Sequence, residues 1–240
     1  STQRTLLVRD FAVAINVGEY EFSEWNSRDG FYSQDKPAKI TKEIYKIFSD
    51  SFDIIFFVSN NKEKPTGIYY GSLRGISNHI EGIGKKIGGS SNNYGSTGKL
   101  KAISHFTYLE AIKRGPTLHE LAHIWANHIV DTKKFICSDS ECKKPIEVTD
   151  MSSHWSFSSV PGHAGGSFVG VEKVAGKEDT YKLVKLDCTP PNVNYIITRC
   201  GGNMWAYPPL ELYLMGLISK DKVPDFETYS GLQVALDANN

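Results

Sequence analysis

The spacing of apolar and polar positions predicts a first half built from short strands and one amphipathic helix. Residues 38–48 repeat apolar side chains such as Ile40 and Ile44 at helical spacing, directly after Pro37, a residue that the first turn of a helix tolerates. Glycine, serine and asparagine dominate residues 77–98, which indicates a loop. Short apolar runs predict strands at 11–17, 53–58, 67–73 and 101–106.

The second half of the chain is interrupted more often by proline, glycine, serine and cysteine. Residues 181–187 and 193–197 predict two short strands, separated by a pair of prolines. Residues 208–219 predict a helix that begins with prolines. We therefore expect an α+β fold, in which an N-terminal mixed sheet with helices precedes a loop-rich, mostly helical C-terminal part.

The composition is that of a neutral globular protein. The chain holds 27 Lys and Arg against 27 Asp and Glu, so it lacks the basic field that binds nucleic acid. A membrane-spanning helix needs about 20 consecutive apolar residues, and the sequence contains no such run. With 40% hydrophobic residues over 240 positions, we expect a monomer with one domain at 1–240, divided into subdomains 1–130 and 131–240.

Four cysteines, Cys137, Cys142, Cys188 and Cys200, favour a secreted or cell-surface protein with two disulfides. The local pairing, 137–142 with 188–200, is one of three possible connectivities. Reduced core cysteines and a second zinc site are the alternatives, although the two-residue spacing typical of zinc sites is absent. No signal-peptide pattern is visible, so the start at Ser1 is expected to reflect trimming or processing.

The pattern H-E-x-x-H occurs once, at His119, Glu120 and His123. On a helix, positions i and i+4 lie on the same face, so the two imidazoles can bind one metal ion. Glu120 lies about 100° around the helix from His119, where it can reach a metal-bound water. These residue types in this order are therefore typical of a zinc-dependent hydrolase.

The flanking sequence supports a rigid helix around this motif. Gly115-Pro116 with Thr117 as a possible cap predicts the helix start. An apolar stripe is expected to pack the helix into the core, and it consists of Leu118, Leu121, Trp125 and Ile129.

A catalytic zinc site takes a third protein ligand, and the residues alone leave its identity open. The metzincin extension is excluded, because Ala126 and Ile129 stand where it requires Gly and His or Asp. His128 misses the ligand register by one residue. The downstream candidates are Glu141, Glu147, Asp150, His154, His163 and Glu211.

Three blocks together resemble a group of secreted or surface bacterial proteins that are treated as zincin-type metallopeptidases. The blocks are HELAH at 119–123, His-Trp-Ser-Phe at 154–157 and Leu-Glu-Leu-Tyr-Leu-Met-Gly-Leu at 210–217. The first block is specific for zincins in general and the other two for this group, and residues 1–100 carry no resemblance. The resemblance implies a zincin-like fold, a zinc cofactor and His154 as the third ligand. On their positions in the sequence, Glu211 and Glu147 are the next candidates.

The expected activity is the hydrolysis of peptide bonds in a protein or peptide substrate. Zinc would lower the pKa of a bound water to about 7, and Glu120 would act as its general base and then protonate the leaving amine. Tyr207, Tyr213 and His163 are candidates to stabilise the oxyanion. Residues 101–106, which precede the metal helix, are the expected sheet edge for an extended substrate.

Two other classes of function remain open. The chain could be a non-catalytic binding or adhesion module on a zincin scaffold, although such a module has no need of Glu120. Alternatively, the metal could be structural, which predicts a closed site with four ligands and a fold that is lost on chelation.

Overall fold

A computed structural model describes most of the chain, and it separates into two compact units. The first unit comprises residues 1–79 and 87–113, and the second comprises 80–86 and 114–240. The H-E-x-x-H helix thus belongs to the second unit, while the expected subdomains 1–130 and 131–240 stay a prediction. The described residues are 5–33, 35–78, 91–125, 132–137, 146–150, 154, 158–165, 168–178, 181–186, 202–228 and 232–235.

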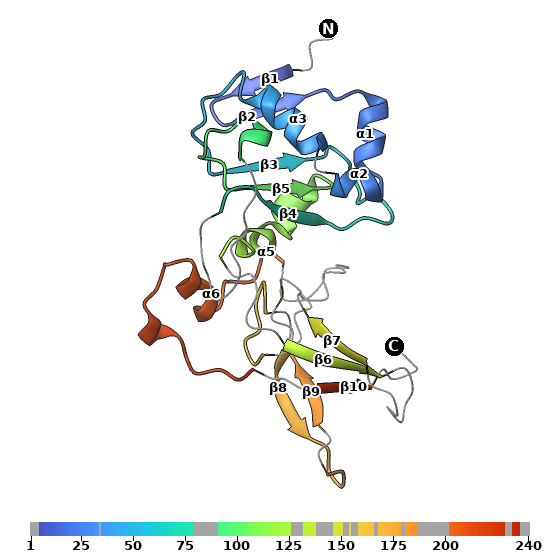
Figure 1. Cartoon of the computed structure of the whole chain (residues 1–240), viewed down its shortest axis with the longest axis vertical. Helices are drawn as coiled ribbons and strands as arrows, with labels where there is room; N and C mark the ends of the chain where they lie inside the picture. The colour runs from blue at the N-terminus through green and yellow to red at the C-terminus, as the bar shows by residue number, and fades with distance from the viewer. Residues whose placement is uncertain are drawn as a thin grey trace. The chain divides into compact units, whose positions relative to one another are not determined.

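The first unit contains a three-stranded mixed sheet of order β3-β5-β4 and a separate β1-β2 hairpin (Figure 1). Strand β5 runs parallel to β3 and antiparallel to β4. The elements are β1 (Thr5–Arg9), β2 (Ala12–Ile15), α1 (Glu19–Trp25), α2 (Arg28–Tyr32), α3 (Asp35–Ile44), β3 (Ile54–Val58), β4 (Gly71–Gly75), the 3-10 helix η1 (Ser91–Tyr94), β5 (Ala102–Phe106) and α4 (Glu110–Arg114).

One face of this sheet is buried under helix α3. Ile55 of β3 and Ile103 of β5 are register partners, so their side chains share a face. Ile40 and Ile44 lie one helical turn apart on α3 and pack with them in one core cluster. The helical spacing of isoleucines thus produces the packing that the sequence predicts for residues 38–48, although α3 begins three residues earlier and ends at Ile44.

Strand β5 confirms the strand expected at 101–106, but the expectation that it is a sheet edge is wrong. It lies between β3 and β4 and pairs with both along its length. All five of its side chains are buried. Its run Ala-Ile-Ser-His-Phe lacks strict alternation, because both faces of a central strand are covered. The strand expected at 67–73 forms at 71–75 instead.

The second unit contains a three-stranded sheet of order β10-β6-β7 and the β8-β9 hairpin (Figure 1). Strand β6 runs parallel to β10 and antiparallel to β7. The elements are α5 (Thr117–Ala122), β6 (Thr132–Cys137), β7 (Ile146–Asp150), β8 (Phe168–Lys173), β9 (Tyr181–Lys185), α6 (Pro209–Leu214), the 3-10 helix η2 (Lys220–Lys222) and β10 (Leu232–Ala235).

The expectation of a mostly helical C-terminal part is therefore wrong. Strands make up most of the regular structure described in this unit, and β9 confirms the strand expected at 181–187. Strand β7 shows why the others were missed. It alternates Ile146 and Val148 with Glu147 and Thr149, the period of a strand, but the run is too short to stand out among prolines, glycines and serines.

The helices of the described residues are short. Helix α6 confirms the start expected near residue 208 but ends at Leu214 rather than 219, because Gly216 adopts a φ of 75° in the left-handed region. The longest helix, α3, has 10 residues. None of the helices in the described part of the chain has the length and apolar content needed to cross a bilayer.

Several sequence predictions lie outside the described residues. They concern the strand at 193–197, His128, Glu141, and three of the four cysteines, Cys142, Cys188 and Cys200. For Cys137, Glu147 and Asp150 the structure describes only the backbone. The two disulfides and the glutamate alternatives at 141 and 147 therefore stay predictions.

Candidate metal centre

Helix α5 carries His119 and is followed directly by His123 at its C-terminal cap, and the first turn of the helix is held by a distant residue. Asn203 accepts a hydrogen bond from the Leu118 amide at 3.0 Å through its side-chain oxygen. The expected cap at Thr117 is wrong, since the helix is preceded by Pro116 and has no side-chain cap of its own. Asn203 thus satisfies a first-turn N–H group that would otherwise lack a partner.

The face that α5 buries also differs from the expected apolar stripe. Leu118, Leu121 and Trp125 are only half-buried, whereas Ala122 is fully buried against Ala164 and Leu210. Because alanine adds little beyond Cβ, it lets α5 approach the segment around residue 164 closely. This close approach brings the helix to the loop that completes the site.

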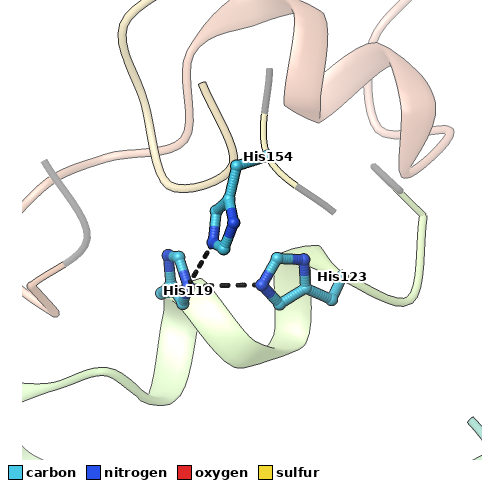
Figure 2. Close-up of side chains that lie close together, drawn as sticks. All are labelled: His119, His123 and His154. Atoms are coloured by element: carbon cyan, nitrogen blue, oxygen red, sulfur yellow. Dashed lines mark hydrogen bonds between the residues drawn. The ribbon is translucent and has the colours of Figure 1, made fainter. Parts of the chain in front are cut away.

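His119, His123 and His154 converge at their Nε2 atoms (Figure 2). His119 Nε2 lies 3.2 Å from His123 Nε2 and 3.1 Å from His154 Nε2. The candidate ligand atoms of the group all lie within 4.8 Å of one another. The helical i,i+4 spacing therefore does place two imidazoles on one face, and a residue 31 positions further along completes the group.

These distances fit a tetrahedral zinc ion. Zn–N bonds of about 2.0–2.1 Å at the tetrahedral angle place two ligand nitrogens about 3.3 Å apart. The two shortest separations of 3.1 and 3.2 Å are close to this value. The donor set, three imidazole nitrogens, is also one that zinc accepts in catalytic sites.

A backbone contact fixes the tautomer of His119. Its Nδ1 atom lies 2.6 Å from the carbonyl oxygen of His163. A carbonyl only accepts hydrogen bonds, so Nδ1 must carry the proton, and the neutral ring then presents a lone pair at Nε2. Metal-binding histidines commonly donate their second N–H in this way, which orients the ring and raises its basicity.

Glu120 follows His119 on α5 and is buried, with 6% of its surface exposed. Its backbone amide donates to Pro116 O at 2.8 Å, a bond of the first helical turn. The 100° rotation per residue separates its side chain from that of His119 on the helix surface. The structure therefore holds the carboxylate on the same rigid turn as the two helix histidines.

Glu211 and His163, two of the candidate ligands, are fully buried but do not belong to the converging group. Glu211 Oε1 accepts from the Ala164 amide at 2.6 Å. Burial raises the pKa of the Glu211 carboxyl to about 7, because desolvation disfavours its charged form. Burial also lowers the pKa of His163, whose Nε2–H donates to the Trp205 carbonyl at 2.9 Å.

The two tyrosines predicted to be catalytic lie at different depths. The Tyr207 hydroxyl donates to the Leu118 carbonyl at 2.7 Å, and burial raises the pKa of Tyr207 well above its ordinary value. Tyr213, on α6, is 37% exposed. Tyr207 thus links the segment before α6 to helix α5 by a hydrogen bond. The oxyanion roles of both tyrosines stay predictions.

Sequence reasoning missed Asn203, the His163 carbonyl and the contact of Glu211 with the 162–165 loop. A backbone carbonyl has no residue-specific signal, but Gly162 offers one. A Cβ atom at Gly162 would lie 2.6 Å from Pro208 Cγ and 2.9 Å from Glu211 Oε1. A position that only glycine can occupy indicates that two segments of the chain approach each other closely.

No protein-family model, curated protein or solved structure matches this chain. The case for a metal centre therefore depends on the three histidines, their distances and the contacts that orient them.

Proposed function

We propose that this protein is a zinc-dependent metallopeptidase of the zincin type. The observation that carries the proposal is the convergence of His119, His123 and His154 beside Glu120, with His119 held in the tautomer that leaves its Nε2 lone pair available. Catalytic zinc sites use three protein ligands and structural sites use four. The buried Glu120 next to His119 supports a catalytic site over a structural one, because a structural site has no use for a general base.

Each residue has a separate role in this proposal. The three histidines hold the metal, which when bound supplies Lewis acidity toward a carbonyl and lowers the pKa of water. Glu120 takes a proton from the attacking water and later delivers it to the leaving amine. Its burial strengthens the electrostatic interactions of the carboxylate with neighbouring charges, since a water-poor environment screens charge less.

The binding or adhesion alternative makes a different prediction about Glu120. A module that only binds its partner does so through the shape and chemistry of its surface and does not require a general base. A hydrolase depends on the carboxylate, and general acid–base catalysis contributes about 10²–10⁴-fold to rate. Replacement of Glu120 therefore separates the two functions.

The test compares zinc content and peptide cleavage in matched variants of the full chain. Wild type should contain one equivalent of zinc by elemental analysis, and His119→Ala should lose it. Glu120→Gln should retain zinc but lose cleavage of a peptide library by at least about 100-fold. Glu172→Gln is the control, because Glu172 is an exposed glutamate on β8 in the same unit.

Two results would contradict the proposal. Wild-type protein that takes up no zinc at neutral pH would remove the metal centre. Wild-type protein that binds zinc and cleaves no faster than Glu120→Gln would leave a metal site without peptidase activity.

A further inference from the structure

We propose that Glu211 is a positioning residue of the metal centre, which holds the peptide group between His163 and Ala164 so that its carbonyl accepts from His119. The inference rests on the function proposed above, because it concerns the zinc ligand His119. In this role Glu211 neither binds the metal nor acts as a general base.

The Glu211 carboxyl group lies inside the 162–165 loop. Its side chain has no exposed surface, and Oε1 accepts from the Ala164 amide at 2.6 Å. The backbone N–H groups of His163 and Gly165 also lower the pKa of this carboxyl group, but the Ala164 amide alone donates a hydrogen bond to it. This one bond fixes the direction of the Ala164 N–H group.

The link to the metal site runs through a single peptide group. The Ala164 N–H donates a hydrogen bond to Glu211, and the His163 C=O accepts one from His119. These two groups belong to the same planar peptide unit. In a trans peptide these two bonds point in opposite directions. A carboxyl group that fixes the direction of the N–H therefore also fixes the direction of the C=O.

Two further contacts hold this peptide group in place. Gly162 lies so close to α6 that an added Cβ would come within 2.9 Å of Glu211 Oε1. His163 Nε2 donates to the Trp205 carbonyl at 2.9 Å, on the stretch that leads into α6. The loop is therefore held by the backbone carbonyl of Trp205, which precedes α6, and by the side chain of Glu211 within α6.

The consequence for the site is the orientation of the His119 ring. The Nδ1–H bond to His163 directs the Nε2 lone pair toward His123 and His154. Outer contacts of this kind typically change metal affinity by about 10–100-fold when they are removed. Loss of the Glu211 acceptor should act on zinc binding through this ring, at a distance from the ion itself.

The experiment measures zinc affinity of the full-length, metal-free protein by competition with a chromogenic chelator. Glu211→Ala should bind zinc about 10–100-fold more weakly than wild type. Glu211→Gln keeps an oxygen acceptor for the Ala164 amide and should bind zinc nearly as tightly as wild type. Glu172→Ala, an exposed change on β8, is the matched control.

The visible spectrum of the Co²⁺-substituted protein provides a second measurement. It reports the geometry of the ligands, and a positioning role predicts a changed spectrum in Glu211→Ala and a wild-type spectrum in Glu211→Gln. A glutamate that itself bound the metal would lose zinc equally in both variants. Equal loss in both would therefore overturn the inference.

The remaining outcomes separate this inference from the proposed function. If wild type binds no zinc, the proposed function fails and the inference fails with it. If wild type and a folded Glu211→Ala bind zinc equally, the inference fails and the proposed function stands. If hydrogen exchange shows that Glu211→Ala unfolds the second unit, Gly162→Ala decides, because it displaces the loop while retaining the carboxyl group. Unchanged zinc affinity in Gly162→Ala would also overturn the inference.

Discussion

The first unit surrounds its sheet with large apolar side chains, whereas the described core cluster of the second unit is formed by Ala122, Ala164 and Leu210. Around this small cluster the second unit uses polar contacts: Asn203 accepts from the Leu118 N–H, Tyr207 donates to the Leu118 C=O, and Glu211 accepts from the 162–165 loop. Burial of apolar area stabilises without directing particular atoms, whereas hydrogen bonds fix directions. Among the described residues, the first unit therefore has the larger apolar cluster, whereas the contacts around the candidate site of the second unit fix the directions of particular groups.

The strongest test of this contrast is removal of the metal. A ligand present at about 1,000 times its Kd stabilises the state that binds it by about 4 kcal/mol. Zinc should therefore raise the free energy of opening of α5 and the 158–165 loop, measured by hydrogen exchange, by about 4 kcal/mol. The free energy of opening of β3 and β5 should not change. His119→Ala should abolish the response. Equal protection of both units by zinc would show that they unfold together.

His105 in the first unit and Glu211 in the second predict opposite contributions to the pH dependence of stability. His105 of β5 packs against Trp25 and Phe31, its Nε2 lies 3.2 Å from Ser59 Oγ, and burial lowers its pKa from 6.5 to about 4. Below pH 6.5 the unfolded chain therefore binds a proton that the folded unit does not.

The stability of the first unit should consequently fall as pH decreases from 6.5 toward 4, by on the order of 3 kcal/mol. His105→Gln does not titrate in this range and should show a weaker fall. The measurement is the free energy of unfolding of both proteins against pH. Parallel curves would contradict the assignment to His105.

Glu211 predicts the reverse in the metal-free second unit. Burial raises its folded pKa from 4.5 to about 7, so between these values the folded state binds more protons than the unfolded chain. Stability should fall as pH rises through this range, by up to on the order of 3 kcal/mol. His163 in the same loop contributes the opposite slope, because burial lowers its pKa, so the effect of Glu211 is the difference between wild type and Glu211→Gln. Measured by hydrogen exchange of the 158–165 loop, the stability of wild type relative to Glu211→Gln should fall as pH rises. A relative stability that rises with pH would contradict the sign.

A substitution in the apolar core of the first unit should lower the stability of that unit without affecting the candidate metal site. Ile103→Val removes one methylene from the face that α3 covers and should cost about 0.5–1.5 kcal/mol in that unit. Zinc affinity should not change, because Ile103 belongs to the other unit. Denaturant unfolding and chelator competition on the same sample check both statements, and a change in zinc affinity would show that the units are coupled.

The smallest effect is expected for Tyr207→Phe. It removes the hydrogen bond to the Leu118 carbonyl and should destabilise the second unit by about 1 kcal/mol. If Tyr207 also stabilises the oxyanion, as the sequence predicts, kcat should fall while zinc affinity is retained. A variant with unchanged kcat would limit Tyr207 to the structural contact.

The sequence alone was most informative where the relevant contacts are local. The 119–123 motif depends only on helical periodicity, and the strands β3 and β5 and helix α3 were recognisable from their apolar spacing. It was less informative where partners are distant: β5 was expected at a sheet edge because order in a sheet depends on which strands pair across the chain. For the third ligand the residues left six candidates, of which His154 was one, and the resemblance pointed to His154.

What the sequence by itself determined is that His119 and His123 share one helix face with Glu120 beside them, because their identity and spacing are local properties of the chain. Tertiary structure decided which further groups meet them. The approach of His154, the carbonyl of His163 and the carboxyl of Glu211 depends on loops packed between α5 and α6. Their placement follows from close packing and hydrogen-bond direction in three dimensions, which no local pattern encodes.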